Sequence, residues 1–116
     1  MEVTAVTEEQ LQAQIFQHHW NNYPHERGLL FHVNQKARNA IEGNKFRALG
    51  VVPGISDLIY LKPRGVPILM ELKTETGSQS GPQKDWETAV TKAGYDYRIV
   101  RSLAEAITIF SSPLAL

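Results

Sequence analysis

Hydrophobic and polar positions predict a chain that alternates between helical and extended segments. Thr7 and Gln10 have the spacing of a capping box, so we expect a first helix to begin after Thr7. Its apolar stripe consists of residues at roughly helical spacing: Leu11, Ile15, Phe16 and Trp20. The run NNYP at residues 21–24 predicts the end of this helix.

The rest of the chain continues this alternation. In chain order, the pattern predicts a strand at 29–34, a helix at 36–49, strands at 56–61 and 66–74, a helix with Pro82 in its first turn, a strand at 95–100, and a last helix opened by a capping box of Ser102 and Glu105. This order predicts an α/β fold, with a central mixed sheet of about four strands flanked by helices. Trp86 lies on the apolar face of its helix and is expected in the core.

The two middle strands are joined by the reversal KPRG at residues 62–65, which predicts a hairpin centred on Arg64. In that register Asp57 faces Glu71 across the hairpin. Because side chains alternate between faces along a strand, Asp57, Glu71 and Lys73 are then expected on the same side of the sheet. A slip of one residue would send Asp57 to the opposite face.

Two carboxylates held about 5 Å apart repel each other unless a proton or a cation lies between them. Oxygen ligands without thiolates favour Mg²⁺, with Mn²⁺ as a substitute, and leave room for a phosphate. Lys73 could orient an attacking water or stabilise charge on a phosphodiester. The alternative is that Glu71 and Lys73 are solvated residues at the end of a surface strand.

Composition adds few constraints. The 116 residues suit one domain spanning 1–116, and the absence of cysteine excludes disulfides and thiolate metal sites. The formal net charge is zero, so contact with nucleic acid would need a local basic patch. No apolar run is long enough to span a bilayer, which favours a soluble protein of the cytoplasm, with no membrane partner. The four histidines lack zinc-ligand spacing, and His18 and His19 are expected to be partly exposed.

Several fragments together resemble one family. They are GVVPGISD at residues 50–57, ELK at 71–73, GPQ at 81–83, GY at 94–95 and VRS at 100–102. This combination is similar to the VRR-NUC domain (virus-type replication-repair nuclease) of the PD-(D/E)xK nuclease superfamily, in its stand-alone phage or bacterial form. The dipeptide Ile55-Ser56 departs from the Val-Pro or similar pair of many members, but Asp57 is kept. The resemblance implies a restriction-endonuclease-like core.

The resemblance also implies roles for individual residues. The metal would be bound by Asp57, Glu71, the backbone carbonyl of Leu72 and a glutamate of the first helix, while Lys73 would serve the attacking water and Gln83 would reach into the site. For the helix carboxylate, Glu8 is favoured over Glu9 because it shares a face with Leu11 and Gln12. Gln83 and Glu8 each have an alternative role. Gln83 has capping-box spacing from Ser80, and Glu8 lies in the first turn of its helix, where an acidic residue suits the helix dipole.

Residues expected to contact DNA are Asn34, Lys36, Arg38, Lys45, Arg47 and Lys84. The four basic residues from 36 to 47 would split between opposite faces of a regular helix, so a solvated role is the alternative for each of them. For Asn34 the alternative is a turn-forming residue before that helix.

The resemblance implies a Mg²⁺-dependent endodeoxyribonuclease, specific for branched DNA, that resolves four-way (Holliday) junctions as a homodimer in a bacterial or phage-infected cell. Apolar Leu114 and Leu116 would help bury the partner or form a loose tail. The alternatives are a nuclease for flaps or other branches and a non-catalytic DNA-binding or assembly module. No Gly-rich phosphate loop, nucleophile elbow or zinc pattern supports a different enzyme or a nucleotide cofactor.

Overall fold

A four-stranded mixed sheet forms the centre of the molecule. The computed structural model of the chain describes residues 5–33 and 36–112. The strands follow one another across the sheet in chain order: β1 (Leu30–His32), β2 (Leu58–Leu61), β3 (Pro67–Leu72) and β4 (Asp96–Val100). The first two pairings are antiparallel, and β3 pairs with β4 in parallel. The expected mixed sheet and α/β class are confirmed.

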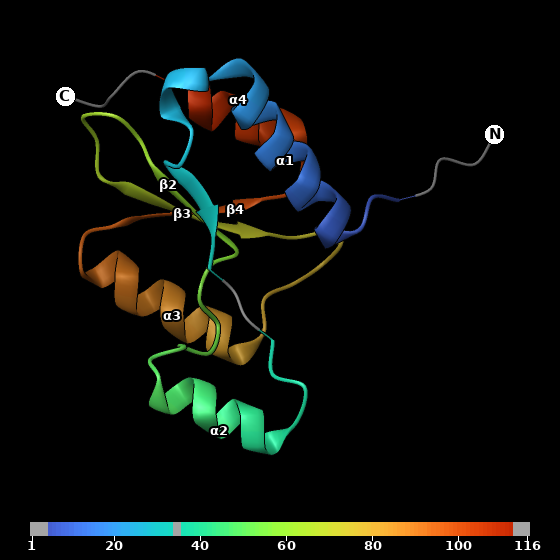
Figure 1. Cartoon of the computed structure of the whole chain (residues 1–116), viewed down its shortest axis with the longest axis vertical. Coiled ribbons are helices and arrows are strands. Elements are labelled where there is room, and N and C mark those ends of the chain that lie inside the picture. Colours follow the sequence, from blue (N-terminus) through green and yellow to red (C-terminus); the bar gives the residue numbers. More distant parts are fainter. Residues whose placement is uncertain (1–4, 34–35, 113–116) are drawn as a thin grey trace.

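Helices cover both faces of this sheet (Figure 1). They are α1 (Glu8–Asn22), α2 (Ala40–Ala48), α3 (Gly81–Lys92) and α4 (Leu103–Ser111), with a short 3-10 helix at Pro24–Glu26. Helices α1 and α4 lie together on one side, α3 lies on the other, and α2 lies beyond α3 at the end of the molecule (Figure 1). Within the described ranges, no helix combines the length and apolar character needed to cross a membrane.

The hydrophobic core fills the space between the sheet and the pair α1 and α4. Its buried members are Leu11, Ile15, Leu30, Leu58, Tyr60, Ile68, Met70, Leu72, Val100, Ala106, Ile109 and Phe110. Because neighbouring strand residues point to opposite faces, the residues between these core positions on β3 and β4, such as Glu71 and Tyr97, project toward the α3 side. Helix α3 itself has no buried residue, and Trp86, expected in the core, is half-buried.

The buried face of α1 differs from the predicted stripe. Leu11, Ile15 and His19 are buried, whereas Phe16 and Trp20 are 38% and 43% exposed. His19 is accepted in the core because its Nε2 lies 3.1 Å from Oε1 of Glu26, so its polar end has a partner. The expectations of an exposed His19 and of a core stripe containing Phe16 and Trp20 are therefore wrong.

Local side-chain hydrogen bonds set the helix boundaries. The capping boxes at Thr7 and Ser80 are both present, as expected. Helix α2 begins later than expected, because the side chain of Asn39 caps the N–H of Glu42. In the last helix Ser102 caps as predicted, but the carboxylate of Glu105 accepts from the N–H of Arg101 instead of closing the box. Asn34, Leu114 and Leu116 lie outside the described residues.

The loop before β2 packs closely against the first turn of α3 at Gly54. This residue has a φ of 79°, and a Cβ atom built on it would lie 2.3 Å from the carbonyl oxygen of Pro82. Both the left-handed backbone and the close approach therefore require glycine. The contact fixes the position of the segment that leads into Asp57.

We expect Gly54→Ala to destabilise the fold more than Gly28→Ala. Gly28 also has a positive φ, 93°, but a Cβ there would meet no atom within 4 Å. The control should cost about 1–2 kcal/mol of unfolding free energy for the backbone alone, and Gly54→Ala a further ~1–3 kcal/mol for the steric conflict. Urea unfolding of both variants measures the difference. Equal costs would show that the α3 contact does not constrain this loop.

Isoleucines at two positions test which face of the molecule carries the core. Ile15 is completely buried, whereas Ile41 on α2 is 83% exposed. Ile15→Ala should lower the unfolding free energy by about 2–5 kcal/mol, and Ile41→Ala should change it by less than about 0.5 kcal/mol at protein concentrations low enough to keep the chain monomeric. Denaturant unfolding followed by circular dichroism measures both values. A large loss for Ile41→Ala would mean that α2 is buried in solution.

Candidate functional site

The register of the β2–β3 hairpin agrees with the sequence prediction. Leu58 pairs with Met70 and Leu61 with Pro67, and the reversal is centred on Arg64, which has a φ of 61°. Continued one step beyond Leu58, the same register places Asp57 opposite Glu71. The two carboxylates therefore occupy facing positions at the ends of neighbouring strands.

Asp57 is held in place by the backbone of β3. Its Oδ2 accepts a hydrogen bond from the N–H of Leu72 at 2.7 Å. The N–H and C=O of a residue in an extended strand project to the same side. The carbonyl oxygen of Leu72 is thus directed toward the side where Asp57 lies, which brings two of the predicted metal-ligand positions together.

Glu71 is a fully buried carboxylate with one oxygen unsatisfied. Its Oε1 accepts a short hydrogen bond from the hydroxyl of Tyr97, whereas its Oε2 is buried without a hydrogen-bond partner. Burial raises the pKa of Glu71, and the charge of Asp57 raises it further. The hydrogen bond from Tyr97, the charge of Lys73 and the nearby amide of Gln79 lower it. An unsatisfied buried carboxylate oxygen is costly, so this atom is suited to a ligand.

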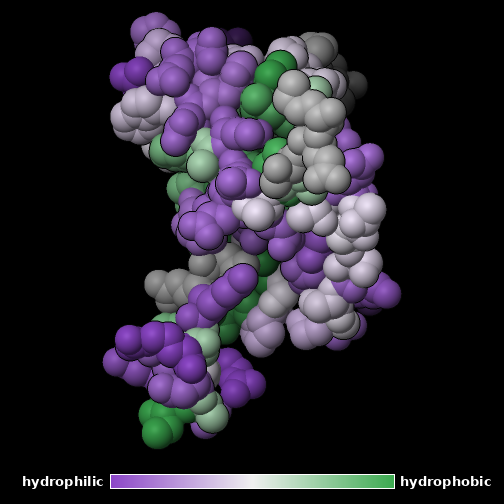
Figure 2. All heavy atoms as spheres, turned by 90° about the vertical axis from the view of Figure 1, so that its right-hand side faces the viewer, coloured by the Kyte–Doolittle hydropathy of each residue, from purple (hydrophilic) through white to green (hydrophobic). Residues whose placement is uncertain are grey.

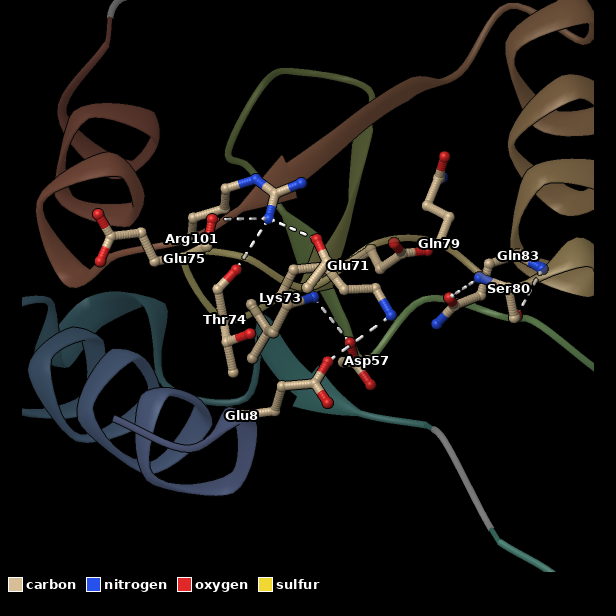
Figure 3. A network of polar contacts seen from close by, with 12 residues as sticks. Glu8, Asp57, Glu71, Lys73, Thr74, Glu75, Gln79, Ser80, Gln83 and Arg101 are labelled. Carbon is tan, nitrogen blue, oxygen red and sulfur yellow. Dashed lines mark hydrogen bonds and ion pairs between the residues drawn. The ribbon is translucent and has the colours of Figure 1, made fainter. Parts of the chain in front are cut away.

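Lys73 continues the same face of β3 and is nearly buried, with 9% of its surface exposed. Its Nζ lies 3.7 Å from Oε1 of Glu8 on α1, and Figure 3 shows the two side chains pointing toward each other beside Asp57. The structure thus brings Glu8 to the ammonium group, and its role as a metal ligand in preference to Glu9 stays a prediction. Both glutamates line an adjoining pocket.

This pocket has a volume of about 310 Å³ and lies beside Asp57, which precedes β2, and Leu72, which ends β3. Its lining residues are Glu8, Glu9, Gln12, His32, Lys36, Asp57 and Leu72. The imidazole Nδ1 of His32 lies 2.8 Å from the backbone carbonyl of Asp57. Carboxylates, a lysine and a histidine around one opening suit a polar, charged ligand.

Two residues that sequence reasoning did not single out for the site support it from β4 and the segment after it. Tyr97 donates to Glu71, as described above. Arg101 donates through Nη1 to the carbonyls of Thr74 at 2.8 Å and Gly77 at 2.7 Å, and so anchors the loop that follows Lys73 (Figure 3). The parallel pairing of β3 with β4 brings these residues to the site. The spacing of residues along a single strand does not show which strand it pairs with, so sequence reasoning could not find them.

Gln83 lies at the start of α3, where its Oε1 accepts from the N–H of Ser80 at 2.8 Å. This is the capping alternative that its spacing suggested. Figure 3 shows Ser80 and Gln83 away from the Glu8–Lys73 pair. A contact between Gln83 and a substrate stays a prediction.

The predicted DNA-contacting residues are dispersed. Lys36 lines the site pocket, whereas Arg38 forms an ion pair with Glu42 at 2.8 Å. Arg47 donates to Asn44. Lys45 and Lys84 lie exposed on α2 and α3, and Asn34 is outside the described residues.

The donor set of this site fits a hard cation. Among residues 5–33 and 36–112, no three His, Asp or Glu side chains could hold a metal ion by themselves. The set near β2 and β3 is instead mixed: Asp57, the unsatisfied Oε2 of Glu71 and the carbonyl of Leu72. Mg²⁺ accepts such a set, because it keeps several waters and commonly takes only one or two carboxylates.

Comparisons with solved structures show a likeness of fold. No protein-family model matches the chain, and no curated protein matches its sequence. A solved structure described as "VRR_NUC domain protein" superimposes with a TM-score of 0.72 at 22% sequence identity, covering 92% of this chain and 87% of that one. The chain therefore has the fold of a VRR_NUC domain protein, which confirms the restriction-endonuclease-like α/β architecture.

Proposed function

We propose that this chain is a metal-dependent nuclease of the VRR-NUC type, which hydrolyses phosphodiester bonds in DNA. The observation that carries the proposal is the unsatisfied buried Oε2 of Glu71, next to Asp57 and Lys73 in a fold shared with a VRR_NUC domain protein. Lys73 offsets only part of the repulsion between the two carboxylates, and a metal cation at the unsatisfied Oε2 would offset the rest.

The roles of the residues follow from their positions. Asp57, Glu71 and the Leu72 carbonyl would hold Mg²⁺, with Glu8 nearby, and Mn²⁺ would substitute. The bound cation would lower the pKa of a water and neutralise charge on the phosphate. Lys73, with its ammonium group near Glu8, would stabilise the charge that builds on the phosphoryl oxygens. The attacking water oxygen bonds to phosphorus and gives up a proton to solvent, the bond between phosphorus and the leaving sugar oxygen breaks, and that oxygen takes a proton from solvent.

We further propose that the substrate is branched DNA, in particular a four-way junction, and that the chain acts as a homodimer. A two-fold pair would present two sites to the two strands of a junction. Helix α2 has apolar surface available for contacts between copies, since Ile41 and Leu49 are 83% and 71% exposed, and Figure 2 shows apolar surface at the α2 end of the molecule. Lys36 at the pocket and the exposed Lys84 supply phosphate contacts.

Conservative changes in the site test the chemistry. Glu71→Gln and Asp57→Asn keep the shape of the side chains but remove the charges that hold the cation, so each should abolish Mg²⁺-dependent cleavage. Lys73→Met should lower the rate by about 10²–10³-fold. The control is Glu75→Gln. The Glu75 side chain is exposed, and Arg101 donates to its backbone carbonyl, which the substitution keeps. Full activity in Glu71→Gln, in a protein that remains folded by circular dichroism, would contradict the proposed site.

The substrate is tested with end-labelled four-way junction, 5′ flap, linear duplex and single strand, each with Mg²⁺, Mn²⁺ or EDTA. We expect paired nicks in the junction that depend on metal, and sedimentation velocity should give a dimer. Cleavage of flaps without cleavage of junctions would keep the nuclease and reject the resolvase. Equal binding of the junction by wild type and Glu71→Gln, with nothing cut, would favour a DNA-binding module.

A further inference from the structure

A chain of hydrogen bonds reaches Glu71 from the surface of α3. The amide nitrogen Nε2 of Gln79 lies 3.1 Å from Oε1 of Glu87 and 3.1 Å from the hydroxyl of Tyr97. The hydroxyl of Tyr97 in turn contacts Oε1 of Glu71. The edge of its ring packs against Trp86, with the centroids 6.0 Å apart. The four polar residues come from four separate segments: Glu71 from β3, Gln79 from the loop after it, Glu87 from α3 and Tyr97 from β4.

The direction of these hydrogen bonds is determined by chemistry. An amide nitrogen can only donate, so Gln79 gives one N–H to Glu87 and the other to the Tyr97 oxygen. The hydroxyl proton of Tyr97 is then free to be donated to Glu71. An ordinary tyrosine hydroxyl keeps its proton at neutral pH, so Tyr97 is the donor in this contact. Glu87 prevents the amide from turning over, because its carboxylate could not pair with an amide oxygen.

We propose that Tyr97 is a positioning residue for the metal site: it holds Oε1 of Glu71 so that Oε2 is the oxygen presented to the cation. Gln79 orients Tyr97, and Glu87 orients Gln79. Buried Glu71 has one oxygen satisfied by this chain and one left unsatisfied, which is the arrangement a single metal–oxygen bond needs. Hydrogen-bonded partners of metal ligands commonly fix the ligand in this way. The inference rests on the proposed metal-dependent function.

The test is a binding titration that does not require catalysis. Mn²⁺ is added to the purified 116-residue chain, and the free ion is measured by electron paramagnetic resonance. In Tyr97→Phe the ring and its contact with Trp86 are kept and the hydroxyl is lost, so we expect the Mn²⁺ dissociation constant to rise ~10–100-fold. Gln79→Leu should act in the same direction with a smaller effect. Tyr95→Phe is the matched control, because Tyr95 lies beside the same strand and is 48% exposed.

Cleavage supplies a second measurement. In Tyr97→Phe the Mg²⁺ concentration for half-maximal rate should rise by a similar factor, while the rate at saturating Mg²⁺ stays near that of wild type. A merely structural role would instead lower the melting temperature and reduce the fraction of active protein, without changing the metal dependence of the remainder. Melting curves of all variants separate these two results.

The outcomes distinguish this inference from the proposed function. If Glu71→Gln loses Mn²⁺ binding while Tyr97→Phe binds as tightly as wild type, the positioning role is wrong and the metal site stands. If wild type shows no Mn²⁺ binding that depends on Glu71, both are wrong. If the Mn²⁺ series behaves as expected but no DNA is cut, the positioning role is supported and the nuclease proposal is rejected.

Discussion

The register of the β2–β3 hairpin determines which side chains meet at the site. It is set at the reversal, where Arg64 accepts a left-handed φ of 61°, and it continues to the far end of both strands. There β2 ends at Leu58, and the Oδ2 of Asp57 takes the N–H of Leu72. The side chain thus extends the ladder beyond the last paired residues of β2. Any slip that displaced Asp57 would also break this hydrogen bond, so the hairpin and the site stabilise each other.

Burying the Glu71 carboxylate has an electrostatic cost. A carboxylate removed from water is tolerated only when it is paired and hydrogen-bonded. Lys73 and the Tyr97 hydroxyl supply part of that compensation, and the unsatisfied Oε2 still costs about 1–3 kcal/mol. A purely structural glutamate would be expected to have both oxygens satisfied. Local violations of this kind are typical of functional sites, where a ligand provides the missing interaction.

The sequence could predict what depends on neighbours along the chain. Capping boxes at Thr7 and Ser80 and the hairpin centred on Arg64 are set by spacings of a few residues, and all three are confirmed. Tertiary pairing was not predictable in the same way. His19 is buried because a glutamate outside its helix satisfies it, and Tyr97 reaches Glu71 only through the parallel pairing of β3 with β4. Polar groups buried by distant partners carry no periodic signal.

Two glutamines near the start of α3 show local spacing and tertiary contacts acting in the same region. The resemblance assigns a site role to Gln83, and its Oε1 is engaged in capping α3. Gln79, four residues earlier, joins the hydrogen-bond chain to Tyr97. Capping uses only the amide oxygen of Gln83, so its nitrogen can still donate to a phosphate that approaches the helix start. The loop that carries Gln79 and the helix start that carries Gln83 are fixed by Arg101 on one side and by the Gly54 contact on the other. A loop anchored at both ends can hold Gln79 against Tyr97 while Gln83 caps the helix and keeps its amide nitrogen available at the helix start.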